Sequence, residues 1–512
     1  MGPPLTRQAI LARVRRLPAA AVAAGTVALV LSLAVVFSAP AHIVSDSENF
    51  VVYFRLLAAG GTVPIHALSV PHPIPALATW LAYETLGGPR AVQFLCALVF
   101  AVFCGAVYDM IRRLAGHPGA VLGLWGILTS QRVIGYVTWG RSPVWGMMFV
   151  GLGLAWLAAA AERNRPENKC AAERHSHGLL AFSALATLSR TDFVFSHILL
   201  CCFFSARLWR LGARRAATRV ACWLTFAFTP FVNDYLFSRD PLWTLHGARH
   251  WKAIEQALHG NTSSAFRPPA GMLAGTRAFL HRIGNALDRG SSILSPIWIA
   301  AWWLGAVRLY RKNRVLFGAV TALLAASVLC WPVYFANGFV VERVFAIPRV
   351  VLFALSGVGL GWLASFLPNP RWRCTALFAL ALGLTCAHLH AYRLALDHLR
   401  KCGRWYQKHA RFAQAIQKAG LREQAPFVSQ DAAADYIYMT RLRLFHDDVP
   451  NERHIRYLRQ TGKPLPPYRS YIRSRPDTPF PEFADMMPGR VLLEEDGIAL
   501  HAAHPPIPPK VP

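Results

Sequence analysis

Apolar stretches long enough to cross a membrane recur along this chain of 512 residues, and they constrain its fold more than any other feature. About 20 consecutive apolar residues cross the hydrocarbon core of a bilayer as a helix. Only 16% of the residues are charged, whereas soluble domains carry about 25%. The sequence therefore predicts a polytopic α-helical membrane protein. The apolar stretches lie at residues 18–40, 91–110, 119–137, 145–161, 179–206, 220–237, 291–307, 315–335, 349–367 and 374–392.

Basic residues cluster between these stretches and indicate how the chain is oriented. Cytoplasmic loops of membrane proteins carry an excess of Lys and Arg, and placing all the clusters in the cytoplasm satisfies this rule. Topology thereby explains the net charge of +28, and we set aside a nucleic-acid interface. The clusters lie near residues 13–16, 112–113, 163–174, 207–219, 308–314 and 371–373.

This orientation fixes the transmembrane domain. Residues 1–17 form a basic cytoplasmic N-terminus, and residues 18–392 form the transmembrane domain. Within it, the stretch 179–206 is long enough for two helices separated at Ser189 to Asp192. Counting it as two predicts about eleven spans.

The same orientation places the larger loops and the tail outside the cytoplasm. Residues 41–90 and 237–290 form two outside loops, which we expect to lie together, and residues 393–512 form a C-terminal domain. Basic residues just after residue 392 favour the cytoplasm, but long domains cross the membrane largely regardless of charge. We therefore expect an extracytoplasmic tail, and the localisation predicted is a bacterial inner membrane.

Helical and strand-like patterns occur in these outside segments. Phe50, Tyr53, Phe54 and Leu57 are spaced i, i+3, i+4, i+7, which predicts a helix lying along the membrane surface. The tail contains "CGRWYQKHARFAQAIQKAG" and then "APFVSQD". Because a helical pattern is followed by a strand-like one, we expect a small α/β or α+β domain.

The order of four segments resembles the GT-C superfamily of integral-membrane glycosyltransferases. An early acidic residue, an aromatic juxtamembrane helix and a His-Pro-Pro-like turn are similar to "SDSENFVVYFRLLAAGG" (45–61) and "HPIPALATWLAYETLGG" (72–88). A Thr-Arg-Pro-Asp-type break is similar to "LSRTDFVFSHILL" (188–200). Later family segments are similar to "FVNDYLFSRDPLWTLHGAR" (231–249) and "ERVFAIPRVVLFALSG" (342–357). The resemblance covers about residues 18–370.

The chain departs from the family pattern at two places. Arg141 and Ser142 stand in "WGRSPVWGMMF", which lacks a Glu that related subfamilies carry after Gly-Met. Ile74 follows His72-Pro73 where the family has a second Pro.

The resemblance implies a mannosyltransferase-like enzyme that transfers a hexose or pentose. The donor would be a polyprenyl-phosphate sugar, and the acceptor a lipid, glycan or protein of the cell envelope. Nucleotide sugars are cytosolic, so an enzyme acting outside needs a donor carried by a lipid. We expect the catalytic centre between the first loop, the 237–290 loop and the membrane surface.

Two carboxylates in the first loop are the candidate catalytic residues. An acceptor hydroxyl loses its proton as it attacks the anomeric carbon, and a carboxylate is a suitable general base. Asp46 and Glu48 are the candidates, and the resemblance falls on Asp46. Residues spaced i, i+2 do not face each other on a helix, so the two are not an equivalent pair. Either acid is also suited to favour the helix dipole near its N-terminus.

Cationic residues outside the spans are candidates for binding the leaving phosphate, whose negative charge they would stabilise. Arg349 could instead snorkel at a helix end, and Arg343 could pair with Glu342. His72 is a candidate for shaping the acceptor site, with a structural role as the alternative. The substrate-binding candidates are Arg343, Arg349, Arg249, Lys252 and His72.

No metal site is predicted. GT-C enzymes differ in their use of a divalent cation, and the sequence shows no cluster of metal ligands. Arg190 and Asp192 lie between two apolar halves, where charges are costly unless they pair. We therefore expect an ion pair that holds the bend.

Two other classes of function compete with a glycosyltransferase. A transporter or flippase of an envelope precursor needs charges embedded along a path and often a repeated half. The spans hold few charges and no repeat is visible. A scaffold protein whose outer loops bind partners is the second alternative.

Overall fold

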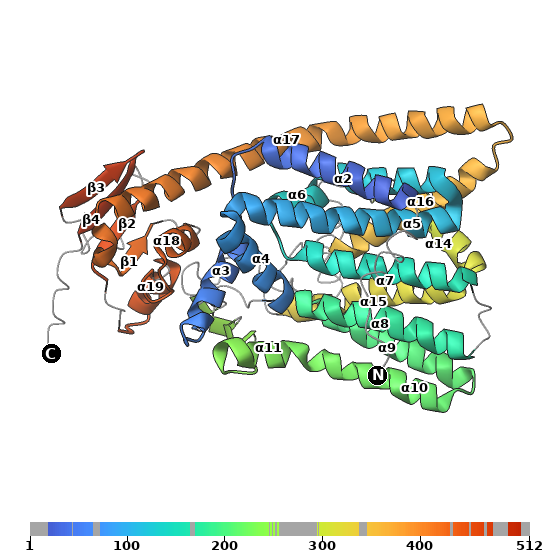
Figure 1. The fold of residues 1–512 in the computed structure, drawn as a ribbon, viewed down its shortest axis with the longest axis horizontal. Helices are drawn as coiled ribbons and strands as arrows, with labels where there is room; N and C mark the ends of the chain where they lie inside the picture. Colours follow the sequence, from blue (N-terminus) through green and yellow to red (C-terminus); the bar gives the residue numbers. More distant parts are fainter. Residues whose placement is uncertain are drawn as a thin grey trace, which may run out of the picture.

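The structure is a computed structural model in which a helical bundle is joined to a small mixed domain (Figure 1). The first loop and the C-terminal domain lie at one end of the bundle. The structure describes residues 19–43, 45–64, 72–163, 169–244, 246–247, 249–250, 253–254, 294, 296–336, 346–430, 434–449, 452–464, 468–474 and 490–502.

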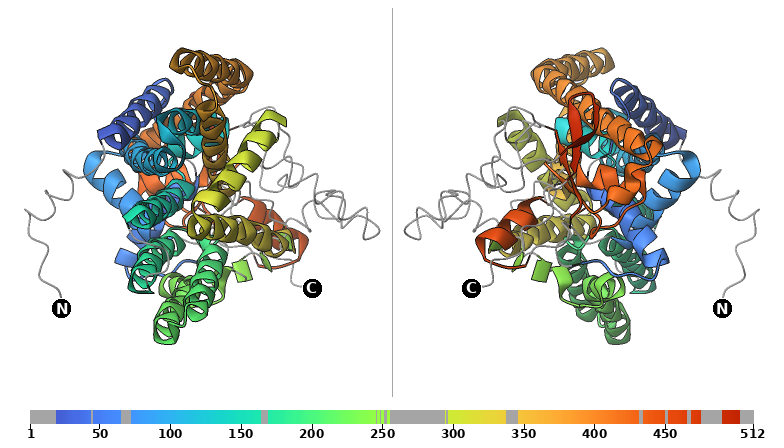
Figure 2. Two further views of the ribbon diagram at one scale, coloured as in Figure 1. Left: turned by 90° about the vertical axis from the view of Figure 1, so that its right-hand side faces the viewer. Right: turned by 90° about the vertical axis from the view of Figure 1, so that its left-hand side faces the viewer.

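Helices make up the bundle, and Figure 2 shows them end-on from both sides. They are α2 (Ala19–Phe37), α5 (Pro89–Thr129), α6 (Gln131–Thr138), α7 (Pro143–Arg163), α8 (Lys169–Ser189), α9 (Phe193–Arg210), α10 (Arg214–Ala221), η1 (Cys222–Phe228), α11 (Thr229–Ser238), α14 (Pro296–Lys312), α15 (Arg314–Ala336), α16 (Ala346–Ser365) and the first part of α17 (Pro370–Lys418).

Helix α5 folds back on itself at Gly116, where φ is 79°. The Gln93 side chain donates to the backbone oxygen of Thr138 in α6 across 2.6 Å, a contact that a straight helix could not make. Residue 116 lies between the predicted stretches 91–110 and 119–137, and two passes here stay a prediction.

Five helices within the described ranges are long and apolar enough to cross a membrane. Their outward faces carry exposed apolar side chains, among them Val30 at 60%, Val121 at 52% and Leu363 at 44% exposure. Such a surface suits lipid rather than water. The expected total of about eleven spans stays a prediction. The five helices are Ala19–Phe37, Pro89–Thr129, Pro143–Ala160, Phe193–Arg210 and Ala346–Ser365.

Small residues allow α16 to pack closely against two neighbouring helices. A Cβ atom on Gly305 of α14 would collide with the carbonyl oxygen of Leu355. A Cβ atom on Gly357 would collide with the backbone of Gly119 in α5. Helices in membranes associate through such close backbone contact, because lipid supplies no hydrophobic driving force between them.

The predicted break within stretch 179–206 is confirmed. Helix α8 ends at Ser189 and α9 begins at Phe193. Between them, Arg190 Nε lies 2.7 Å from Asp192 Oδ1, and both side chains are less than a tenth exposed. The expected ion pair therefore spans the bend.

Helix α17 runs without interruption from the bundle into the C-terminal domain (Figure 1). Its 49 residues correspond to about 74 Å, more than twice the ~30 Å hydrocarbon core of a bilayer. The sequence predicts a span at 374–392 and a separate domain from residue 393. The predicted boundary falls inside one helix. The sequence placed it there because the apolar composition fades, although the helical pattern continues.

The C-terminal domain is a four-stranded mixed sheet with two short helices, as the α/β or α+β prediction requires. Strand order is β1-β2-β4-β3; β1 and β2 are parallel, and the other pairs are antiparallel. In register, Ile472 of β2 pairs with Leu500 of β4. The elements are η4 (Leu421–Gln424), β1 (Phe427–Ser429), α18 (Asp435–Leu442), α19 (Glu452–Gln460), β2 (Ser470–Arg473), β3 (Val491–Glu495) and β4 (Ile498–Ala502).

Two helices of the first loop, α3 (Ser45–Ala58) and α4 (Pro73–Leu86), lie between the bundle and this domain (Figure 1). Val52 of α3 is part of the domain core, together with Phe412 of α17. Phe50 and Tyr53 are also buried, at 2% and 0% exposure. The predicted helix is therefore present, but protein covers much of the face that was expected to meet the membrane.

Candidate active site

The first turn of α3 is fastened to the loop between α6 and α7. The Ser47 hydroxyl donates to the backbone oxygen of Gly140, and both residues are buried. Asp46 is the second residue of α3, and its side chain lies outside the described part of the structure. The backbone nonetheless places Asp46 at this junction, one residue before Ser47.

The same loop connects this junction to the break between α8 and α9. The Arg190 guanidinium donates to the Ser142 hydroxyl across 3.1 Å as well as pairing with Asp192. Ser142 is two residues from Gly140, so a line of polar contacts runs from the start of α3 into the bundle. Hydrogen-bonded charges of this kind inside a membrane domain are typical of functional sites.

Arg349 is fully buried in the first turn of α16. Its guanidinium donates to the Tyr136 hydroxyl of α6 across 3.2 Å. The alternative of a snorkelling side chain at the lipid interface is wrong, because neighbouring helices cover the whole residue. A buried guanidinium presents several donors in a fixed geometry, which suits a phosphate.

Glu48 points toward the C-terminal domain. It is 1% exposed, and the Tyr406 hydroxyl of α17 donates to its Oε1 across 2.6 Å. Burial raises the pKa of Glu48 to about 8, although the Tyr406 hydrogen bond and the charge of Arg441 both oppose the shift. A carboxyl with this pKa is mostly protonated at neutral pH, which makes it a poor general base.

The other candidates from the sequence are not all brought into this group. His72 precedes α4, and its ring centroid lies 6.2 Å from that of Phe50, a packing contact that favours its structural alternative. Arg249 is exposed. Arg343 and Lys252 lie outside the described residues.

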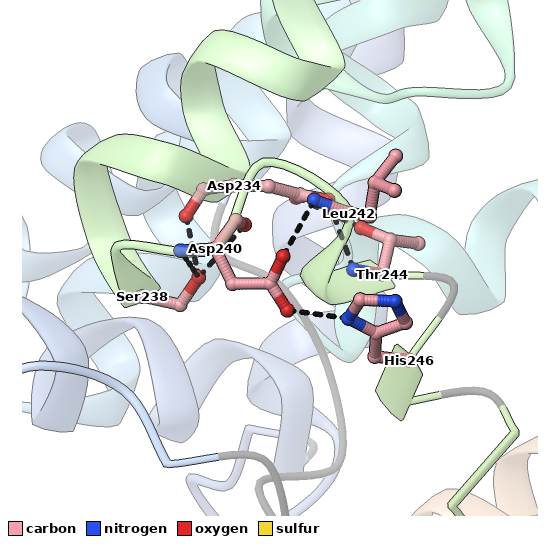
Figure 3. A network of polar contacts seen from close by, with 6 residues as sticks. All are labelled: Asp234, Ser238, Asp240, Leu242, Thr244 and His246. Carbon is pink, nitrogen blue, oxygen red and sulfur yellow. Dashed lines mark hydrogen bonds and ion pairs between the residues drawn. The ribbon is translucent and has the colours of Figure 1, made fainter.

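The segment that follows α11 is held by a local network of hydrogen bonds (Figure 3). Asp234 accepts hydrogen bonds from the backbone N–H and the hydroxyl of Thr244, at 2.9 and 2.8 Å. Asp240 Oδ2 lies 2.6 Å from His246 Nδ1, and this hydrogen bond, together with that from the Leu242 N–H, lowers the pKa of Asp240. The network orders the turn that leads toward Arg249.

The described parts of the first loop and of the segment from Phe237 to Trp243 lie together. The Val63 N–H donates to the backbone oxygen of Phe237 across 2.9 Å. The ring centroids of Phe54 and Phe237 lie 5.8 Å apart, and Trp243 is buried in the same apolar cluster.

Several residues of the site carry no motif that sequence reasoning recognised. Tyr406 and Arg441 are distant in the chain from Glu48, and the contacts of Tyr136 and Ser142 follow only from helix packing. Arg141 stood out only as a departure from the family pattern, and its guanidinium lies 4.3 Å from the Trp139 ring centroid. Within the described ranges, no group of three or more His, Cys, Asp or Glu residues could hold a metal ion.

The sequence matches no protein-family model and no curated protein. The fold, in contrast, is similar to that of ArnT from Cupriavidus metallidurans bound to undecaprenyl phosphate. The TM-score is 0.55 at 16% identity, and the similarity covers 93% of this chain and 96% of ArnT.

A second similar structure is the archaeal oligosaccharyltransferase AglB from Archaeoglobus fulgidus in complex with an inhibitory peptide and a dolichol-phosphate. Here the TM-score is 0.54 at 12% identity, over 88% of this chain and 69% of AglB. Both are GT-C membrane glycosyltransferases. The chain has the GT-C fold. The resemblance seen in the sequence is thus confirmed for the fold, a multi-span helical membrane protein with a small mixed C-terminal sheet.

Proposed function

We propose that this protein is a membrane glycosyltransferase that moves a sugar from a polyprenyl-phosphate donor to an acceptor of the cell envelope. The observation that carries the proposal is the combination of the GT-C fold with polar contacts at the start of α3. ArnT binds undecaprenyl phosphate and AglB binds dolichol-phosphate in their structures, and a donor of this chemistry suits the buried Arg349. The reaction would take place on the extracytoplasmic face of a bacterial inner membrane.

Asp46 is the proposed general base. The acceptor hydroxyl oxygen bonds to the anomeric carbon while the bond from that carbon to the donor phosphate oxygen breaks. The hydroxyl proton passes to the Asp46 carboxylate, and the bonding electrons leave with the phosphate. Proton transfer to a positioned carboxylate contributes typically 10²–10⁴-fold to a rate.

Arg349 is the proposed stabiliser of the leaving phosphate, because its guanidinium is buried and held by Tyr136. Fixed donors in a site without water stabilise developing charge far more than they would in solution. Arg343, Lys252 and the exposed Arg249 remain proposals for further contacts to the donor, and His72 for the acceptor.

We assign Glu48 a positioning role rather than proton abstraction. It touches Tyr406 of the long helix, and it lies in the same helix as Asp46. Its contact therefore sets where the first turn of α3 lies relative to the C-terminal domain.

A transporter or flippase of an envelope precursor is the alternative. It would use the buried charges Arg190, Asp192 and Arg349 as a path for a charged substrate. The close contacts among these helices favour a fixed site over such a path. Uptake of a radiolabelled precursor into proteoliposomes carrying the purified protein would support the alternative.

Comparative analysis of envelope lipids and glycans from cells with and without the gene tests the proposal. We expect one sugar modification to be missing, to return with the wild-type gene, and to stay missing with Asp46→Asn at equal membrane abundance. Asp496→Asn is the matched control, because Asp496 is an exposed carboxylate of the turn between β3 and β4 and pairs with Arg411 across 2.9 Å. An unchanged profile in the cells lacking the gene would refute the proposal.

A further inference from the structure

Two adjoining cavities lie between α2, α17 and the α5–α6 segment. Their volumes are about 280 and 350 Å³. Val35, Tyr392 and Leu396 line both, so the two cavities form one groove along α17. We call it the α2–α17 groove.

The longer part of the groove is apolar and borders the lipid-facing surface. Leu31 and Leu389 line it and are 38% and 62% exposed. Its floor is closed by polar contacts between helices, such as the hydrogen bond of 3.0 Å from Trp125 to Thr385. At 1.5 Å per residue, α17 from Thr385 to His398 is about 20 Å long, slightly more than one leaflet of a ~30 Å core.

The other end of the groove is cationic and aromatic. Arg141, Trp139 and His398 line it. The Arg141 guanidinium lies 4.3 Å from the Trp139 ring centroid, and the His398 ring lies 5.6 Å from the same residue. The apolar stretch 374–392 ends just before His398. This end of the groove therefore lies at the level expected for lipid head groups.

Further positive charge surrounds this end. Arg90 donates to the backbone oxygen of Ala39 across 2.9 Å, and Arg400 to that of Ser38 across 3.3 Å, both just beyond α2. Among the described side chains, exposed Asp397 lies 3.7 Å from Arg400. The pKa of His42 is lowered, chiefly by burial and further by the charges of Arg90 and His398. In the described part of the chain, this end carries more cations than acids, which is complementary to an anionic head group.

We propose that the α2–α17 groove binds an anionic phospholipid of the bilayer, with its phosphate on Arg141 and one acyl chain along α17. An apolar channel as long as a leaflet takes the chain, and the cationic end takes the phosphate. The head group of a zwitterionic lipid also carries a positive charge. The Arg and His side chains of the site repel that charge, so the site selects against such a lipid.

This site adjoins the proposed phosphate contact at Arg349, because Tyr136 lines the cationic end of the groove and also accepts the hydrogen bond from Arg349. Arg141 directly follows Gly140, the residue to which Ser47 of α3 is fastened. A lipid bound to Arg141 therefore places its head group at the first turn of α3. The inference goes beyond the proposed function and does not depend on Asp46 being a base.

Lipid binding to the delipidated full-length protein in detergent, followed by native mass spectrometry, tests the proposal. The probes are dioleoyl phosphatidylglycerol and dioleoyl phosphatidylcholine, which share their chains. We expect the anionic lipid to bind about tenfold more tightly, as one hydrogen bond between charged groups provides. Arg141→Gln should abolish this preference, and Leu396→Trp, which fills the groove, should weaken binding of both lipids.

Arg393→Gln is the matched control, because Arg393 is an exposed cation on α17 that does not line the groove. It should bind both lipids as the wild type does. Equal binding of the two lipids by the wild type, or a preference retained in Arg141→Gln, would overturn the proposal. So would an Arg141-dependent site for undecaprenyl phosphate that phosphatidylglycerol does not occupy. If Leu396→Trp fails to fold, the comparison of the two lipids on the wild type and on Arg141→Gln still tests the proposal.

Discussion

Tyr406 of α17 donates a hydrogen bond of 2.6 Å to Glu48 of α3, although 358 residues separate the two in the chain. Both residues are buried. Arg55 of the same helix adds a second connection, donating to the backbone oxygen of Thr440 in α18 across 2.7 Å. The helix that carries the proposed base is therefore held by the C-terminal domain as well as by the bundle.

The raised pKa of Glu48 predicts a measurable dependence of stability on pH. The folded protein keeps the Glu48 proton up to about pH 8, whereas the unfolded chain loses it near the ordinary value of 4.5. Between these values the fold binds more protons, so the free energy of unfolding falls as pH rises. Glu48→Gln mimics the protonated form. Its apparent melting temperature in detergent should equal that of the wild type near pH 5 and exceed it at pH 8.5.

Glu84→Gln is the control for this comparison. Glu84 is an acid of neighbouring α4 that pairs with Arg55 and is 29% exposed. This variant should keep the wild-type pH dependence. If the melting temperatures of the wild type and of Glu48→Gln differ by the same amount at every pH from 5 to 8.5, Glu48 is not buried in its protonated form.

Arg349 is predicted to stabilise the leaving phosphate. Arg349→Lys and Arg349→Gln should each lower the rate of sugar transfer, the latter by about 10²–10³-fold, as removal of one fixed donor does. Arg404→Gln, an exposed cation on α17, should not change the rate. Transfer assays in proteoliposomes with each variant measure the effect, and wild-type rates in Arg349→Gln would remove this residue from the mechanism.

The ion pair between Arg190 and Asp192 is predicted to hold the bend between α8 and α9. Asp192→Asn leaves a buried guanidinium without its carboxylate, which costs about 3–5 kcal/mol. The double variant Arg190→Gln with Asp192→Asn should be less destabilised than the single one. Thermal unfolding in detergent compares the wild type with these two variants and with Arg190→Gln; losses of the two single variants that add up to that of the double variant would show that the two charges do not act as a pair.

The predicted orientation is tested with a reporter enzyme that is active only outside the cytoplasm. Alkaline phosphatase fused after Gly61 should be active, because the first loop is predicted to lie outside. The same reporter fused after Asn313, between α14 and α15, should be inactive. Activity of the second fusion and not of the first would invert the topology and exclude an extracytoplasmic Asp46.

The sequence predicted the elements whose signals are local. The break at Ser189 to Asp192 follows from charges between two apolar halves. The end of α4 follows from Gly87, whose φ is 92°, whereas its start at Pro73 was not predicted, because His72 to Pro75 were expected to interrupt a helix. The strand at Phe427–Ser429 also matched its pattern.

The parts that depend on distant partners could not be predicted. Phe50 and Tyr53 have the spacing of a membrane-surface helix, and only the folded chain shows that protein covers them. Both belong to the apolar cluster of Phe237 and Trp243, and Tyr53 also stacks on His446 of the C-terminal domain. Arg349 has the position of a snorkelling side chain, and α6 decides its burial. Glu48 looked like a second base because its partner Tyr406 lies far away in the chain.

The unbroken course of α17 fixes the height of the C-terminal domain above the bilayer. One residue inserted between Asp397 and Arg404 would rotate the domain by about 100° and lift it by about 1.5 Å. Seven inserted residues would nearly restore its facing but raise it by about 10 Å, away from α3. The distance between the membrane and the domain can therefore change only by steps that also turn the domain.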